Sequence, residues 1–143
     1  MRIDGLWLPD ETGTYCPVVP AAVSVAGSDH LVQFLVDTGA AQTVLGAGFA
    51  PLLQAHRQTP AELSLLSAGG VVPHFYAAVA LNFTDTVGRR VRFNIIGAVL
   101  TDPTQANTHL LGRDILDHFA VLCDREADVV ALLRPPHTYT ISG

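Results

Sequence analysis

Apolar and polar residues alternate over many short stretches of the chain, which is the pattern of half-buried β-strands. Turn-forming residues separate the stretches, as at 27–29 and 85–90. No strand–helix–strand repeat is present, so we expect an all-β fold, most simply a closed barrel. The expected strands span residues 1–7, 18–26, 30–36, 43–45, 61–66, 74–83, 91–100, 110–111, 120–123 and 128–133.

Helical spacing is confined to one short segment. Residues 113–119 place Ile115, Leu116 and Phe119 on one face, which predicts one short helix towards the C-terminus. The pattern of residues 49–57 fits a helical turn or a loop equally. Pro20 lies within the strand expected at 18–26, which suggests an edge position because proline cannot donate to a ladder.

Composition narrows the class of protein. The 143 residues favour one domain, 1–143, with a core from about 16 to 134, and 49% hydrophobic against 15% charged residues favours a folded chain. A net charge of −5 argues against binding to nucleic acid or to an anionic membrane. The chain has no lysine, which excludes a lysine phosphate loop and Schiff-base chemistry.

Cysteine content and hydropathy favour a cytoplasmic protein. Cys16 and Cys123 form neither a disulfide framework nor a metal quartet. We expect both to be reduced, and a single disulfide between them is the alternative. No apolar run is long enough to span a bilayer, and the N-terminus lacks the apolar region of a signal peptide.

One carboxylate stands out. The apolar run at 34–36 leads directly into Asp37, which Thr38 and Gly39 follow before a second apolar run at 43–45. A lone carboxylate at the end of a buried strand is costly unless its charge is held. Threonine adds a hydroxyl, and glycine lets other groups approach the backbone. This arrangement indicates a working carboxylate.

The sequence Leu-Val-Asp-Thr-Gly-Ala at 35–40 resembles the active-site loop of the retropepsin-like aspartic proteases. That family has a second signature, two apolar residues and a glycine leading into a short helix. It matches Leu-Leu-Gly-Arg-Asp-Ile-Leu at 110–116. The resemblance implies an acid-protease barrel, with a flap hairpin around residues 67–70 that closes over the substrate.

Hydrolysis of a peptide bond by carboxylates alone requires two of them sharing a proton. This chain has one Asp-Thr-Gly, so a two-fold homodimer would supply the second Asp37. The resemblance therefore implies a homodimeric aspartic endopeptidase with a polypeptide substrate and no cofactor or metal. The resemblance also implies that Asp37, Thr38 and Gly39 are the catalytic residues. The other implied site residues are Ala40, Ala41, Gly69, Gly70, Thr108 and Leu110 for substrate binding, and Gly112, Arg113 and Asp114 for structural support.

Two departures from the family accompany the resemblance. Ala40 stands where many two-lobed relatives have a serine that donates to the catalytic carboxylate, so we expect a pH optimum that is only mildly acidic. Ala41 stands where retroviral members carry an aspartate that pairs with the arginine of the second signature. Arg113 then needs another partner, with Asp114 and Asp124 as candidates, and a tight dimer is less favoured.

Two alternatives to an active enzyme stay open: a non-catalytic barrel that binds peptides or dimerises, and a monomer that a partner activates. The role of the terminal segments is also open. Ile3, Leu6 and Trp7 fit a dimer interface, or Trp7 covers the open end of the barrel, and the tail at 137–143 fits an intersubunit sheet.

Other groupings carry little chemistry. The six histidines lack metalloprotease spacing, and no serine lies in a nucleophile elbow. Asp114 and His118 have a spacing that can hold a metal, but a solvated helix face is the favoured interpretation. Arg89, Arg90 and Arg92 are interpreted as a solvated hairpin end.

Overall fold

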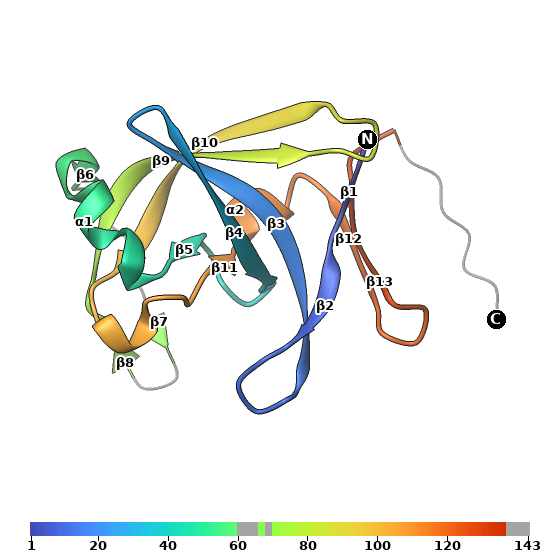
Figure 1. Ribbon diagram of the computed structural model, residues 1–143, viewed down its shortest axis with the longest axis horizontal. Helices are drawn as coiled ribbons and strands as arrows, with labels where there is room; N and C mark the ends of the chain where they lie inside the picture. Colours follow the sequence, from blue (N-terminus) through green and yellow to red (C-terminus); the bar gives the residue numbers. More distant parts are fainter. Residues whose placement is uncertain (60–65, 68–69, 137–143) are drawn as a thin grey trace.

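The computed structural model describes residues 1–59, 66–67 and 70–136, and β-strands dominate these residues (Figure 1). The strands are β1 (Arg2–Asp4), β2 (Leu6–Pro9), β3 (Tyr15–Val25), β4 (Ser28–Val36), β5 (Val44–Leu45), β6 (Arg57–Gln58), β7 (Leu66–Ser67), β8 (Gly70–Val71), β9 (His74–Thr84), β10 (Arg90–Leu100), β11 (Leu110–Leu111), β12 (Ala120–Asp124) and β13 (Val129–Leu133). The α-helices are single turns, α1 (Ala50–Leu53) and α2 (Arg113–Leu116). The mostly β class expected from the sequence is confirmed.

The main sheet has the order β2-β3-β4-β11-β5-β10-β9-β6, and β3 pairs with β9 as well. Strand β3 is therefore not an edge strand, and the expectation from Pro20 was wrong. One side of β3 pairs with β2 through residues 15–18 and with β9 through residues 22–24. Pro20 lies between these two stretches, where that side of the strand has no ladder partner and the missing N–H is tolerated.

The core forms between the inward faces of the sheet. On β3 every second residue from Val19 to Val25 is buried, and on β4 Val32 and Phe34 are buried. Ile3 on β1 is only 1% exposed and belongs to the same cluster. The core therefore begins before residue 16, and Ile3 is a core residue rather than a residue available for an interface.

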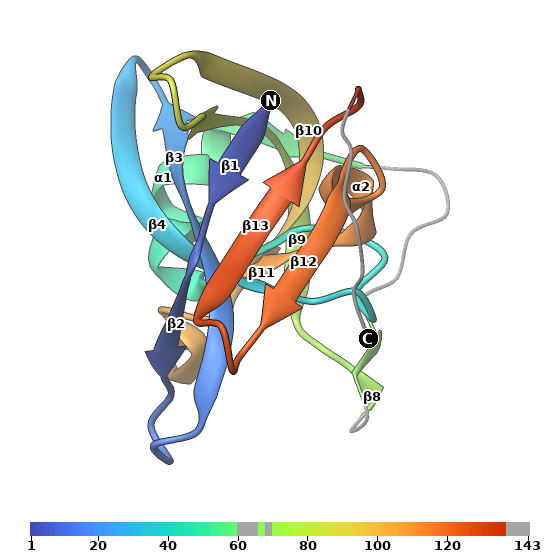
Figure 2. The same ribbon diagram turned by 90° about the vertical axis from the view of Figure 1, so that its right-hand side faces the viewer.

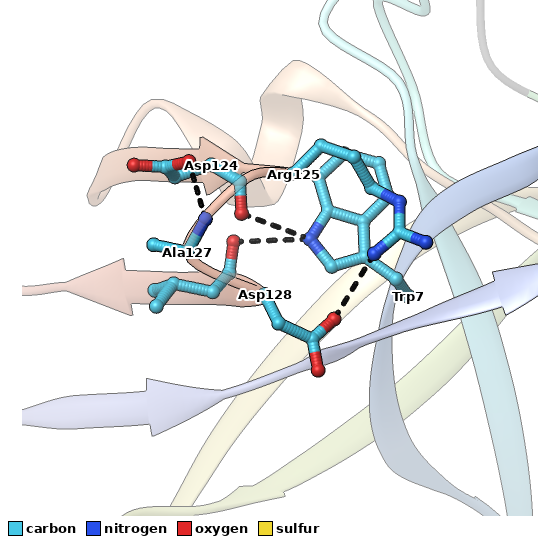
Figure 3. A network of polar contacts seen from close by, with 6 residues as sticks. Trp7, Asp124, Arg125, Ala127 and Asp128 are labelled. Carbon is cyan, nitrogen blue, oxygen red and sulfur yellow. Dashed lines mark hydrogen bonds and ion pairs between the residues drawn. The ribbon is translucent and has the colours of Figure 1, made fainter.

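A smaller sheet, β1-β13-β12, joins the two ends of the described chain (Figure 2). The indole Nε1 of Trp7 donates to the carbonyl oxygens of Asp124 and Val129 at 3.2 and 3.3 Å (Figure 3). The guanidinium of Arg125 lies over the rings of Trp7 and Tyr15, 5.6 and 4.2 Å from their centroids. Trp7 thus ties β2 to the β12–β13 hairpin of its own chain.

Local turns differ slightly from expectation. Ala26 and Gly27, both with positive φ (49° and 82°), form the two-residue loop between β3 and β4, one residue earlier than predicted. The segment 49–57, for which a helical turn and a loop were both open, is largely helical. Helix α1 follows one 3₁₀ turn, Ala47–Phe49, and precedes another, Gln54–His56, so it adds a short helix to the one predicted at 113–119. Helix α2 is shorter than 113–119, because its last amides bond back three residues instead of four.

The expected flap falls only partly within the described residues. Strands β7 and β8 pair antiparallel, with Ser67 opposite Gly70. Residues 61–65, Gly69 and the tail at 137–143, on which further expectations rest, lie outside the described residues. Within the described residues no helix has the length and apolar character needed to cross a membrane.

Candidate active site

Asp37 follows directly on the last residue of β4, where β11 runs parallel beside it. The amide of Leu35 donates to the carbonyl of His109 at 2.9 Å, and the amide of Asp37 donates to the carbonyl of Leu111 at 3.1 Å. On β4 the core face carries Val32 and Phe34. Since side chains alternate along a strand, Leu35 and Asp37 share the opposite face.

The loop after β4 holds the Asp37 carboxylate in place. Its Oδ1 accepts hydrogen bonds from the amides of Gly39 and Ala40 at 2.9 and 3.2 Å. A Cβ atom on Gly39 would lie 3.2 Å from this same oxygen, so glycine gives the carboxylate room. Oδ2 takes no hydrogen bond from any described residue. One oxygen is thus fixed, and the other remains available to water or to a second carboxylate.

Thr38 lies on the outside of this loop. Its side chain is exposed, and its hydroxyl makes no hydrogen bond to another described residue. The expected catalytic residues are therefore contiguous, with Asp37 half-buried and with Thr38 and Gly39 exposed.

The two sequence signatures meet at this site. The amides of Arg113 and Asp114 donate to the carbonyls of Ala40 and Ala41 at 2.9 and 3.3 Å. The hydroxyl of Thr43 donates to Oδ1 of Asp114 at 2.7 Å. Figure 1 shows the corresponding placement of the β4–β5 loop next to β11 and α2. The second signature thus supports the loop that carries Asp37.

Gly112 permits this close approach. A Cβ atom at this position would lie 2.2 Å from the backbone carbon of Gln42 and 2.7 Å from the amide nitrogen of Thr43. Both are backbone atoms and cannot move aside as a flexible side chain can. The supporting role expected for Gly112 therefore has a steric basis.

Arg113 has neither of the partners suggested by the sequence. Its side chain is exposed and forms no ion pair with any described residue. Asp114 instead accepts the Thr43 hydroxyl, and Asp124 accepts the amide of Ala127 at 2.9 Å. Only the backbone of Arg113 supports the loop, and its guanidinium remains exposed.

The expected substrate-binding residues other than Gly69, which lies outside the described residues, differ in exposure and in the elements that carry them. Ala40 is half-buried, Ala41 and Thr108 are exposed, and Gly70 lies in β8. Leu110 packs against a small cluster on the outer face of the main sheet that includes Val44 and Tyr76. Thr108 and Leu110 also line a pocket together with Leu35.

Three residues near the site were missed by sequence reasoning. Thr43 was noted only as part of a strand, although a polar residue inside an apolar run is itself a signal. Tyr76 is buried with a hydroxyl that has no hydrogen-bond partner among the described residues, and its burial raises its pKa. No local pattern in the sequence indicates this.

His109 is the third missed residue. Its Nδ1 accepts a hydrogen bond from the amide of Gly46 at 3.0 Å. The ring makes edge contacts with the rings of Phe34 and Phe49, with centroid distances of 5.9 and 5.6 Å. Burial lowers the pKa of His109, which favours the neutral ring that this hydrogen bond requires.

Asp114 and His118, whose spacing could hold a metal, both have other contacts in the structure. Across residues 1–59, 66–67 and 70–136, no group of three or more histidine, cysteine or acidic side chains is placed to hold a metal ion. Asp114 is engaged with Thr43, and the ring of His118 lies 5.3 Å from that of Phe93. Cys16 and Cys123 are both free thiols.

Comparisons with known proteins agree with the motifs. A family model described as gag-polyprotein putative aspartyl protease matches residues 21–118, which include both signatures. A retropepsin-like aspartic protease from Rickettsia conorii matches the fold with a TM-score of 0.50 at 21% identity, over 92% of this chain and 97% of that one. The EIAV protease complexed with the inhibitor HBY-793 matches at 22% identity with a TM-score of 0.47, over 77% of this chain and 92% of that one. No curated protein matches the sequence. The family match confirms the resemblance, and the chain belongs to the gag-polyprotein putative aspartyl proteases, which are retropepsin-like.

Proposed function

We propose that this chain is an aspartic endopeptidase that works as a two-fold homodimer. The observation that carries the proposal is the Asp37 carboxylate, which has one oxygen fixed by two backbone amides and the other without a partner among the described residues. Each chain contributes one such carboxylate. Two of them, related by symmetry, form the pair that the chemistry requires.

In this mechanism the two Asp37 carboxylates share one proton and hold a water molecule between them. The ionised carboxylate takes a proton from the water as the water attacks the peptide carbonyl, and the protonated one donates to the carbonyl oxygen. Two close carboxylates cannot both ionise easily, so the pair titrates as a unit. Thr38, exposed beside Asp37, would contact the loop of the partner.

The substrate would bind as an extended strand across the cleft face of the acid-protease barrel, under the hairpin that includes Gly70. Backbone hydrogen bonds would supply affinity, and pockets for alternate side chains would supply specificity. The absence of a hydroxyl at Ala40 favours a pH optimum that is only mildly acidic.

A partner-activated or non-catalytic form is the second candidate, and a specific observation favours it. Ala41 carries no charge, and the guanidinium of Arg113 is exposed without an ion pair to any described residue. The expected charge pair beside the site is therefore missing. A weak dimer, or a chain that needs another protein to assemble, follows from this difference.

The test combines cleavage with the oligomeric state. Purified protein is incubated with a mixed peptide library between mildly acidic and neutral pH, beside Asp37→Asn and the control Asp117→Asn, an exposed residue. Asparagine keeps an oxygen for the two amide bonds but loses the charge. We expect cleavage by the wild type and the control only, with dimers seen by sedimentation. Cleavage that persists in Asp37→Asn would refute the enzyme assignment, whereas dimers without cleavage would support the binding module.

A further inference from the structure

A pocket of about 380 Å³ lies between the β2–β3 hairpin and the end of β4, the strand that leads into Asp37. Buried or half-buried apolar side chains form its inner wall, and an exposed residue, Asp10, lies at its rim. The apolar wall consists of Leu8, Val18, Leu35 and Leu110.

The pocket and the candidate catalytic carboxylate share one face of β4. Leu35 precedes Asp37 by two residues, so both side chains leave the strand on the same side, about 7 Å apart along the chain. Leu110 pairs with Leu35 across β4 and β11. An extended peptide that passes Asp37 would therefore place a neighbouring side chain over this pocket.

Asp10 gives the pocket its charge. Among the described residues that line it, Asp10 alone carries a full charge, and the other polar groups there are neutral. His109 also lines the pocket, but its Nδ1 is engaged by the amide of Gly46, which requires the uncharged ring. A cationic group in the pocket would therefore meet one negative charge and, among the described lining residues, no positive charge.

The β2–β3 loop fixes the Asp10 carboxylate and keeps it ionised. Its Oδ1 accepts the amide and hydroxyl of Thr12 at 2.8 and 2.7 Å and the amide of Thr14 at 2.9 Å. These hydrogen bonds, above all that of the Thr12 hydroxyl, lower the pKa of Asp10. Its Oδ2 has no hydrogen-bond partner among the described residues. The carboxylate thus stays charged at mildly acidic pH and can accept a bond from a ligand.

We propose that this pocket is a subsite for a lysine or arginine side chain of the peptide, with the aliphatic stem against the apolar wall and the cation at Asp10. Long basic side chains suit such a place because they bury their stems and keep their charged ends near water. A glutamate would bring like charge to Asp10 and is disfavoured. The subsite deepens the proposed function, and in a two-fold dimer one copy lies on each side of the scissile bond.

The test measures binding separately from cleavage. An uncharged peptide carries norleucine, lysine, arginine or glutamate at one central position, and its affinity for the Asp37→Asn protein is measured by fluorescence anisotropy. We expect lysine and arginine peptides to bind about three- to fivefold tighter than the norleucine peptide, as for a partly exposed ion pair, and the glutamate peptide to bind most weakly.

A second substitution assigns the preference to Asp10. Asp10→Asn retains an oxygen for the three loop bonds while removing the charge, so the preference for basic residues should disappear. Asp102→Asn is the matched control, because Asp102 likewise accepts the amide and hydroxyl of Thr104, at 2.9 and 2.8 Å, but lies outside the pocket. An equal loss in both variants, or an unchanged preference in Asp10→Asn, would overturn the proposal.

Cys16 offers a measurement that needs no change to the pocket. It is half-buried and lines the pocket, whereas Cys123 is exposed on β12. Bound lysine peptide should slow the alkylation of Cys16 but not of Cys123, and equal rates with and without peptide would contradict the proposal. Wild-type cleavage of the same peptides is scored separately. Cleavage without an Asp10-dependent preference refutes only the subsite, and an Asp10-dependent preference without cleavage refutes only the enzyme.

Discussion

The hydroxyl of Thr43 lies between the two signatures of this fold and bonds to Asp114. It donates to the Asp114 carboxylate at 2.7 Å, and its oxygen accepts the amide of Gly112 at 3.2 Å. Thr43 is fully buried, with 0% of its surface exposed. One side chain therefore satisfies two groups of the second signature from within the segment that follows Asp37, and the geometry of the site depends on it.

We expect Thr43→Val to destabilise the protein by about 2 to 3 kcal/mol, because a buried amide and a half-buried carboxylate lose their partner while the shape is kept. Urea unfolding measures the change. Thr43→Ser, which keeps the hydroxyl, is the control and should lose much less. Equal losses in the two variants would mean that packing of the methyl group matters at this position as much as the hydrogen bonds do, and would contradict the dominant role given to the hydroxyl.

Gly112→Ala should be more harmful than the small change in volume suggests. The added carbon would overlap the backbone of Gln42 and Thr43, so the two signatures must separate, and we expect a loss of about 3 kcal/mol with loss of any peptidase activity. Gly97→Ala is the matched control. Gly97 is also buried, yet its added carbon would meet no atom closer than 3.6 Å. Thermal unfolding that is equally affected in both variants would contradict the steric explanation.

Much of the fold could be predicted from the sequence, because its strands follow local patterns. The β3–β4 and β9–β10 hairpins have alternating or continuous apolar residues with turn formers between them. The edge position predicted from Pro20 was wrong because the effect of a proline depends on the partner strands, which are set by the whole sheet. Ile3 misled similarly, since no local pattern reveals that β1 pairs with β13 and enters the core.

The candidate site was likewise predictable where it depends on local motifs and not where it depends on residues distant in sequence. Asp37 and Gly112 were identified because each lies in a compact motif. The roles of Thr43 and His109 depend on residues distant in sequence, Asp114 and Gly46, which only the fold brings close. The loss of the family's ion pair at Arg113 could be anticipated from Ala41. That neither Asp114 nor Asp124 takes its place could not, because ion pairing at an exposed residue is decided by geometry.

His109 should make the protein less stable in acid. Burial lowers its pKa in the folded state below the ordinary value of 6.5, so the unfolded chain binds the proton more readily. Its contribution is fully present above pH 6.5 and is lost as the pH falls towards the folded pKa, where protonation also removes the acceptor for the Gly46 amide.

The corresponding experiment compares the free energy of unfolding at pH 7 and pH 5 in the wild type and in His109→Gln. Glutamine can accept the Gly46 amide but does not titrate, so the variant should lose less stability on acidification than the wild type does. His56→Gln, at an exposed position, should behave like the wild type. Parallel pH curves for the wild type and His109→Gln would contradict the assignment.

Ala40 bears on the pH at which the proposed enzyme works. Its amide lies 3.2 Å from Oδ1 of Asp37, so a hydroxyl on the side chain of the same residue would be within reach of the carboxylate. A donor there stabilises the ionised form. We therefore expect Ala40→Ser to move the acid limb of kcat/KM to lower pH by about one unit, since a hydrogen bond to a charged group contributes about 1.5 kcal/mol.

The control for this shift is Ala41→Ser, which adds the same hydroxyl at the exposed neighbouring position. Its pH profile should match that of the wild type. If both serine variants moved the acid limb equally, general polarity of the loop would explain the shift. If Ala40→Ser left the limb in place, the mildly acidic optimum would need a different cause, because the carboxylate would then be indifferent to the donor that two-lobed relatives supply.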